Sequence, residues 1–311
     1  MDIRQITNII AIEEEGNIAR AAEKLFLTQS ALNQQLLKLE HELGTPLFER
    51  QRHRMVPTPA GRVYLEKARQ IVDIKEEAYR IIGDYANETA GEISIVYTPE
   101  RGSRMFAAIF PTFREKYPAV TVHTFEARNR KMEQMLLHKD VTLACMSYTS
   151  HTVNAEFSYY AKVEEPFVIA YPATHEHAAK AGEDSHLHPP VIDLTLLKDE
   201  EFIMHTRETL SRSVEDRAFS MAGYTPKVLF ETSSSAVALE MVRKQFSPAI
   251  MQQGYAQKDP RIVYFRFEPF PTWTICVATR KDAYLTIPER YLVRLISEYH
   301  HRELVPEAEH V

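Results

Sequence analysis

The stretch LFLTQSALNQQLLKLEHELG, residues 25–44, decides the fold of the first part of the chain. Its leucines recur at steps of four, three and four, at Leu32, Leu36, Leu39 and Leu43. This spacing predicts one apolar face of a helix. Thr28 stands where a capping hydroxyl is expected, and Gly44 is the residue type that commonly ends a helix. The sequence therefore predicts a helix between these two residues.

The face opposite the leucines carries Ser30, Asn33, Gln34 and Leu37. Asn and Gln amides present a donor and an acceptor together, which matches the edge of adenine in a DNA major groove. The alternative is an ordinary solvated face, but such faces are commonly rich in Lys and Glu. Here no charge appears until Lys38. The pattern favours a helix that reads bases.

Two shorter helices are predicted before this one. Isoleucines at a spacing of three and four indicate a first helix that stops near Gly16. Asn17 is placed to cap a second helix, in which Ala21 and Ala22 make a narrow apolar stripe. Small residues there allow another helix to approach closely. Two helices joined by a connection of a few residues are typical of a helix-turn-helix.

A basic hairpin is predicted directly after the third helix. Residues 47–50 and 54–56 read as two short strands joined by a tight turn. The densest basic stretch of the chain lies here, at Arg50, Arg52, His53 and Arg54. An arginine in this position can reach phosphates or enter a narrow minor groove. We interpret the hairpin as the wing of a winged helix-turn-helix.

Composition restricts the class of protein. The chain has 311 residues, 44% of them hydrophobic, which suffices for two or three compact domains. The net charge of −6 confines any nucleic-acid-binding surface to a local basic patch. We find no signal peptide and no apolar run of about 20 residues, so we expect a cytoplasmic protein that does not enter the membrane. Cys145 and Cys276 lie in apolar runs, which excludes a disulfide framework and leaves open a redox switch.

The run GNIARAAEKLFLTQSALNQQLLKLEHELGTPLFER (16–50), followed by PTPAG (57–61), resembles the N-terminal domain of the LysR-type transcriptional regulators. The resemblance covers nearly all of residues 1–65 without gaps. The family usually has Pro, Ser and Arg where Ser30, Asn33 and Gln34 stand, and losing that Arg should favour an adenine-compatible contact. The predicted DNA-binding residues are Asn17, Arg20, Thr28, Gln29, Ser30, Asn33, Gln34, Lys38, Arg50, Arg52, His53 and Arg54.

A long helix should follow, capped by Thr58, opened by Pro59 and running to about residue 87. Its heptad positions are Tyr64, Ala68, Ile71, Lys75, Ala78, Ile82 and Tyr85. The helix could pack on its own domain, but a repeat this long with charged flanks favours a partner helix. We expect a homodimer or homotetramer that places two recognition helices on a pseudo-palindromic duplex.

From Gly91 onwards strands alternate with helices, which predicts an α/β fold with two parallel-sheet lobes and loop in the 150s. The order of elements over about residues 91–300 is similar to the LysR-type effector domain, which resembles periplasmic binding proteins. We expect a winged helix-turn-helix domain at 1–58, a linker helix at 59–88 and an effector domain at 89–311. Within it, lobe I spans about 91–163 and 270–300, and lobe II spans about 164–269.

Ligands of open parallel sheets bind beyond the carboxyl ends of the strands, where helices begin. Three hydroxyl-rich loops qualify, at residues 98–103, 205–209 and 233–235. We expect a cleft for a small anionic metabolite, although each Ser or Thr could merely cap a helix. Phe246 could narrow this cleft. The predicted effector-binding residues are Thr98, Glu100, Arg101, Ser103, Arg128, Tyr148, His205, Thr206, Arg207, Thr209 and Phe246.

The sequence thus predicts a DNA-binding transcriptional regulator whose lobes close on an effector and alter how the subunits meet. No catalytic motif is present, so we expect neither an enzyme nor a cofactor. Two His-x-His pairs, His175 with His177 and His186 with His188, leave a metal site open as an alternative. The rival hypothesis is a metabolite or metal sensor, or an enzyme, that uses the same two-lobed architecture without binding DNA.

Overall fold

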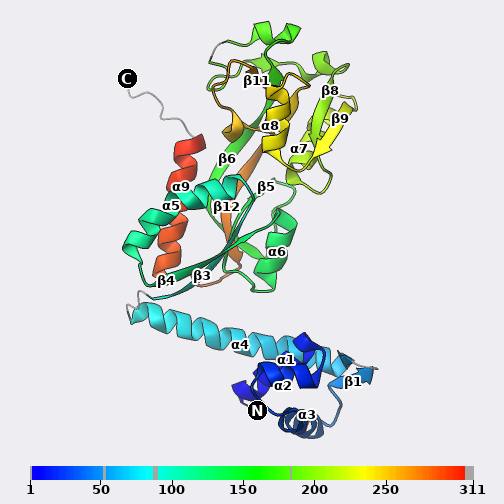
Figure 1. Ribbon diagram of the computed structural model, residues 1–311, viewed down its shortest axis with the longest axis vertical. Coiled ribbons are helices and arrows are strands. Elements are labelled where there is room, and N and C mark those ends of the chain that lie inside the picture. Colours follow the sequence, from blue (N-terminus) through cyan, green and yellow to red (C-terminus); the bar gives the residue numbers. More distant parts are fainter. Residues whose placement is uncertain (1, 52–53, 87–89, 183, 305–311) are drawn as a thin grey trace. The chain divides into compact units, whose positions relative to one another are not determined.

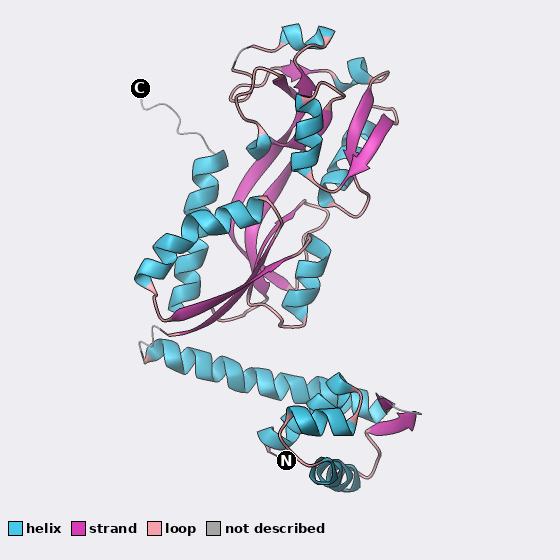
Figure 2. Cartoon of the chain, in the orientation of Figure 1, coloured by secondary structure: helices cyan, strands magenta, loops and turns pink. Residues whose placement is uncertain are grey.

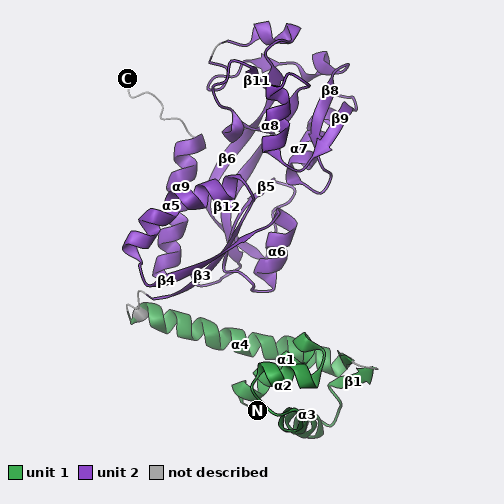
Figure 3. Cartoon of the chain, in the orientation of Figure 1, with its two compact units in different colours: residues 1–88 green, residues 89–311 purple. Residues whose placement is uncertain are grey.

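The computed structural model describes residues 2–51, 54–86, 90–182 and 184–304 (Figure 1). The chain divides into two compact units, residues 1–88 and 89–311 (Figure 3). None of the helices in the described ranges combines the length and apolar character needed to cross a bilayer.

The first unit contains the predicted helices and hairpin. Its elements are α1 (Ile3–Glu15), α2 (Ile18–Lys24), α3 (Gln29–Leu43), β1 (Phe48–Gln51), β2 (Arg54–Pro57) and α4 (Pro59–Tyr85). The predicted caps are confirmed: the Asn17 side chain accepts from the first backbone amides of α2, and Thr28 accepts from Ala31 N. Gly16 and Gly44 end α1 and α3 with φ of 58° and 71°, which suits glycine.

The apolar face of α3 forms part of the core of this unit. Leu32, Leu36 and Leu39 are buried with Ala21 and Ala22 of α2, as the pattern predicted. Leu43 is 46% exposed, so the apolar face ends one turn earlier than expected. Leu43 is the last residue of α3, directly before Gly44, and it does not belong to the buried cluster that contains Leu32, Leu36 and Leu39.

Gly61 allows α4 to pass close to the backbone before the hairpin. A Cβ atom at this position would lie 1.9 Å from the carbonyl oxygen of Leu47. Thr58 strengthens the junction, since its hydroxyl accepts from Gly61 N and donates to Pro46 O. The PTPAG motif therefore fixes the start of α4 against the hairpin.

Only the later part of the heptad pattern on α4 is exposed. Ala68 is buried and Tyr64 packs against the core of the first unit, so these two positions serve their own domain. Farther along, Ile71, Ile74 and Ile82 are exposed. The first part of α4 therefore packs within its own unit, whereas the later part leaves an apolar stripe exposed.

The second unit is built on one long sheet with strand order β4-β3-β5-β12-β6-β10-β8-β9. Its strands are β3 (Gly91–Tyr97), β4 (Val120–Glu126), β5 (Leu143–Tyr148), β6 (Phe157–Pro172), β7 (Val191–Ile192), β8 (Glu201–His205), β9 (Lys227–Thr232), β10 (Ala249–Gln252), β11 (Ile262–Phe267) and β12 (Thr272–Arg280). The helices are α5 (Arg101–Lys116), α6 (Asn129–Leu137), α7 (Leu210–Met221), α8 (Ser235–Arg243) and α9 (Ile287–Leu304), with 3₁₀ turns at Glu176–Lys180, Leu194–Leu197 and Gln253–Tyr255.

Separate sets of buried residues, two clusters in each lobe, divide this unit into two lobes. Lobe I packs around Ile95, Met105 and Phe113, and lobe II packs around Phe167 and Phe202. Strands β6 and β12 pair antiparallel and pass from one lobe to the other, as Figure 2 shows. Both strands therefore connect the two lobes.

Two expectations for this unit are wrong. The loop expected in the 150s belongs partly to β6, which is 16 residues long. The sheet is mixed rather than parallel, because β12 runs antiparallel to β5 and β6. Charged residues such as Lys162 and Glu164 interrupt the apolar pattern of β6, and they concealed the strand in the sequence.

Candidate functional site

The polar face of α3 and the basic hairpin meet in the first unit. Ser30, Gln34 and Lys38 are exposed. Asn33 is half-buried, and Arg50 Nη2 donates a hydrogen bond to its Oδ1 atom at 2.8 Å. The hairpin is held in place because Met55 N donates to Gly16 O at 2.8 Å. A guanidinium group thus lies beside the amide that is predicted to read bases.

The other predicted DNA-binding residues are placed as follows. Asn17 Oδ1 accepts from two backbone amides of α2, which occupies this atom. The Arg20 guanidinium donates to Glu15 O, and the hydroxyls of Thr28 and Ser30 lie 3.2 Å apart at the start of α3. Gln29 and Arg54 are exposed. Arg52 and His53 lie outside the described residues.

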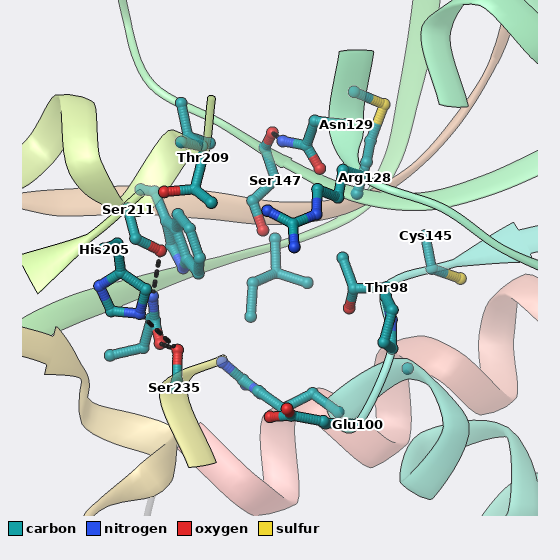
Figure 4. Close-up of a pocket in the computed structure, with 18 of the residues that line it drawn as sticks. Thr98, Glu100, Arg128, Asn129, Cys145, Ser147, His205, Thr209, Ser211 and Ser235 are labelled. Carbon is teal, nitrogen blue, oxygen red and sulfur yellow. Dashed lines mark hydrogen bonds between the residues drawn. The ribbon is translucent and has the colours of Figure 1, made fainter. Parts of the chain in front are cut away.

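A cavity of about 270 Å³ lies between the lobes of the second unit. The starts of α5, α6, α7 and α8 contribute to its wall, as Figure 4 shows. A helix start offers free backbone amides and a partial positive charge, so this wall suits an anionic group. Six predicted effector residues line the cavity: Thr98, Glu100, Arg101, Arg128, His205 and Thr209.

The remaining predicted effector residues are absent from this wall. Ser103 Oγ donates to Glu126 at 2.6 Å, and the ring of Tyr148 packs 4.7 Å from that of Tyr159. Phe246 is 63% exposed in the turn after α8, so it does not narrow the cleft. Thr206 and Arg207 also lie off the wall, which their neighbours Glu208 and Thr209 line instead.

A buried ion pair stands beside the cavity. Arg101 Nη1 lies 2.8 Å and 2.7 Å from the two carboxylate oxygens of Glu165, whose side chain is fully buried. Glu165 also accepts from Gly254 N at 2.9 Å and from Trp273 Nε1 at 2.7 Å. Burial alone would lower the pKa of Arg101, but the adjacent carboxylate outweighs burial and raises it. Arg101 is therefore charged and engaged within the protein.

A chain of hydrogen bonds in lobe II orients the hydroxyl of Ser211, which lines the cavity. His205 Nδ1 contacts the buried Glu215 carboxylate, and its Nε2 lies 2.9 Å from Ser235 Oγ. Ser235 donates to Gln252 Oε1 at 3.2 Å, and Gln252 Nε2 donates to Ser211 Oγ at 2.7 Å. Because Ser211 Oγ accepts a hydrogen bond from Gln252, its own O–H group can donate a hydrogen bond to a ligand.

His300 of α9 was not predicted and also lines the cavity. It is 6% exposed, and its Nδ1 atom has no hydrogen-bond partner among the described residues. Burial lowers the pKa of His300 to about 4, so the ring is neutral at physiological pH. A buried nitrogen without a partner is costly, and a polar ligand atom can satisfy it.

Neither the redox nor the metal alternative receives geometric support. Cys145 and Cys276 are free and buried, and burial raises the pKa of both thiols, Cys276 to about 12. Across the described ranges, no group of three or more His, Cys, Asp or Glu side chains could hold a metal ion. His175 lies 2.9 Å from Tyr171 Oη and 3.3 Å from a Glu200 oxygen.

Sequence comparison matches two family models to this chain. Residues 3–62 match the bacterial regulatory helix-turn-helix protein, lysR family, and residues 86–300 match the LysR substrate binding domain. The uncharacterized HTH-type transcriptional regulator YcgK of Bacillus subtilis is 24% identical, covering 96% of this chain and 94% of its own length. The regulator BsdA of the same organism is 25% identical, covering 95% of this chain and all of its own.

Comparison with solved structures gives the same fold. A full-length OxyR cysteine variant from Pseudomonas aeruginosa has a TM-score of 0.67 at 20% identity, covering 97% of this chain and 95% of that chain. Full-length BenM has a TM-score of 0.56 at 19% identity, covering 97% and 98%. These similarities extend over both units.

Proposed function

The chain belongs to the LysR family of DNA-binding transcriptional regulators with an effector-binding domain, and we propose that its effector is a small anion held between the two lobes. The cavity wall supports this assignment, because helix starts, the Ser211 hydroxyl and the Arg128 guanidinium all favour negative charge. At about 270 Å³ the cavity lies at the lower end of the usual range for ligand pockets, which favours a small metabolite.

We assign the DNA contacts to α3 and the hairpin in a domain spanning 1–58. The observation that carries this assignment is the hydrogen bond from Arg50 to Asn33. It holds the Asn33 amide in one orientation and keeps a positive charge next to it. Gln34 is exposed on the adjacent position of the helix and is free to reach a base edge.

We assign subunit association to the linker segment, residues 59–88, in which α4 spans Pro59–Tyr85. Its exposed apolar residues are Val63, Ile71, Ile74, Tyr79 and Ile82. A second copy of α4 would bury them and so support a homodimer or homotetramer, each pair presenting two recognition helices. A regulator of this kind acts on chromosomal DNA in the cytoplasm.

We favour a regulator over an enzyme or a sensor that does not bind DNA. The relatives matched over nearly the full length are named as transcriptional regulators. The face of α3 that would meet the duplex is uncovered within its unit. Residues 89–311 then form the effector domain that regulates this contact.

A gel-shift assay with the DNA beside the protein's own gene tests the assignment. Retention should weaken between about 50 and 200 mM salt, because released counterions accompany phosphate contacts. Asn33→Ala and Gln34→Ala should abolish specific retention, each costing about 1–3 kcal/mol. Gln257→Ala, which removes an exposed amide from the other unit, serves as the matched control. Absence of retention at every salt concentration would contradict DNA binding by this chain.

A further inference from the structure

Glu100 lines the cavity, as Figure 4 shows, and it also contacts the opposite lobe. It precedes α5 in lobe I, but all the hydrogen bonds that its carboxylate accepts from the described residues come from lobe II. Ser234 Oγ donates to Glu100 Oε1, while Ala236 N and Tyr255 Oη donate to Oε2 at 3.4 Å and 3.2 Å. We call these three donors the α8 carboxylate site.

The position of Glu100 in its own helix shows that the contact is directed outward. It is the N-cap residue of α5, yet its side chain makes no capping hydrogen bond to that helix. An acidic N-cap residue ordinarily accepts from the second or third amide of its own helix. Here the carboxylate instead serves the start of α8 in the other lobe.

The backbone of Glu100 is strained in this arrangement. Its φ of 63° and ψ of −82° correspond to a γ-turn conformation that is rare for a residue with a side chain. Such conformations are unfavourable and persist only where surrounding contacts maintain them. The contacts with lobe II are therefore holding residue 100 in a conformation that it would otherwise leave.

The donors in the α8 carboxylate site are neutral and suit any carboxylate. Within the described ranges, no cationic group lies within 4.0 Å of the Glu100 carboxylate, and the adjacent Arg101 is engaged by Glu165. Burial, followed by the nearby Glu100, raises the pKa of Tyr255 to about 12. Tyr255 therefore keeps its proton and remains a donor. Nothing in this set of donors distinguishes Glu100 from the carboxylate of a ligand.

We propose that Glu100 acts as an internal ligand: its carboxylate fills the α8 carboxylate site and joins the lobes until the carboxylate of the effector replaces it. The effector is then a small carboxylate that competes with Glu100. Other polar groups are ready to bind the rest of such a molecule, since the cavity also presents the unpartnered Nδ1 of His300. The replacement step rests on the proposed effector function, whereas occupation of the site can be tested without an effector.

Acetate rescue of Glu100→Ala in the full-length protein provides that test. Trp273 is the only tryptophan of the chain and lines the cavity, so its emission reports on the site. Glu100→Ala should melt at a lower temperature than the wild type. Acetate, compared with chloride at equal ionic strength, should raise its melting temperature and change Trp273 emission in a saturable way. The acetate midpoint should be at least about tenfold lower than for the wild type, which corresponds to 1.4 kcal/mol.

Two further variants identify the site. Glu126→Ala removes an exposed carboxylate that accepts from Ser103, and it should respond to acetate like the wild type. Glu100→Ala combined with Ser234→Ala lacks one donor of the α8 carboxylate site and should lose the rescue. If Glu100→Ala cannot be purified folded, Glu100→Gln, which keeps the shape and one acceptor oxygen, should show a weaker acetate-specific response.

An equal acetate response in all variants would overturn the proposal. So would an unchanged melting temperature and emission of Glu100→Ala, because the carboxylate would then hold nothing. DNA retention by the wild type is measured separately. If the wild type does not bind DNA but acetate rescues Glu100→Ala, the regulator assignment is refuted and the occupation of the α8 carboxylate site by Glu100 stands. If the wild type binds DNA but acetate does not rescue Glu100→Ala, only the occupation of that site is refuted.

Discussion

Replacing Glu165 by Ala should severely destabilise the effector domain. The carboxylate is fully buried and receives two contacts from Arg101, one from Gly254 N and one from Trp273 Nε1. Its removal leaves a guanidinium group that is only 17% exposed without a counter-ion. Breaking a buried ion pair in this way costs about 3–5 kcal/mol. Loss of the two neutral hydrogen bonds, worth about 1 kcal/mol each, favours the upper part of that range.

Urea unfolding followed by Trp273 emission measures this loss. Because the chain has one tryptophan, the signal comes from the unit of residues 89–311 and not from the first unit. With a slope of about 3 kcal/mol per molar urea, the midpoint should fall by about 1 to 1.7 M. Glu156→Ala, which removes an exposed carboxylate from the same unit, should change stability by less than about 0.5 kcal/mol.

Adding Arg101→Met to Glu165→Ala separates the charge from the packing. An apolar side chain of similar length removes the uncompensated guanidinium, so the double variant should be more stable than Glu165→Ala alone. If Glu165→Ala instead stays within about 1 kcal/mol of the wild type, the ion pair does not stabilise the lobe junction. The physical account of this network would then be wrong.

Three further outcomes follow from other parts of the structure. Gly61→Ala should lower the melting temperature of the first unit followed by circular dichroism, since its Cβ would lie 1.9 Å from Leu47 O; an unchanged transition would contradict the close approach. Ile74→Glu should convert the oligomer to a monomer in sedimentation velocity, while Val153→Glu, at an exposed site in the other unit, should not. Burial lowers the pKa of His300 from 6.5 to about 4, so the unfolded chain binds a proton at a higher pH than the folded protein does. The free energy of unfolding should therefore fall by up to about 3 kcal/mol as the pH drops from 6.5 to 4. Urea titrations of His300→Leu should show a weaker dependence on pH.

The first unit was largely predictable because its signals are local. Thr28, Asn17 and Gly44 act within a turn of the helix that they begin or end, so their roles are visible in the sequence. Leu43 continues the spacing of the buried leucines of α3, so its exposure at the last position of the helix could not be foreseen. The same holds for Ala68, a heptad position whose burial is visible only in the fold.

In the second unit, the loops after parallel strands were found because such loops meet at one edge of a sheet. Side-chain direction was harder to predict. Cys145, Met146 and Ser147 line the cavity, whereas Tyr148, one residue farther along β5, packs against Tyr159 instead. His300, which lines the cavity, and Glu165, which pairs with the lining residue Arg101, come from segments distant in sequence from the loops. Nothing local to His300 indicates that it reaches the cavity, and nothing local to Glu165 indicates that it pairs with Arg101.

The two networks beside the cavity are linked through one peptide bond. Glu100 reaches the start of α8, while Arg101 reaches Glu165 where β6 crosses between the lobes. A ligand that releases Glu100 also frees the strained backbone that positions Arg101. Displacement of Glu100 by a ligand would thus also affect the Arg101–Glu165 ion pair on β6, one of the two strands that connect the lobes. This is the coupling that a regulator requires. The effector must therefore bind more tightly to the form in which residue 100 has relaxed, because equal affinity for both forms would leave their populations unchanged.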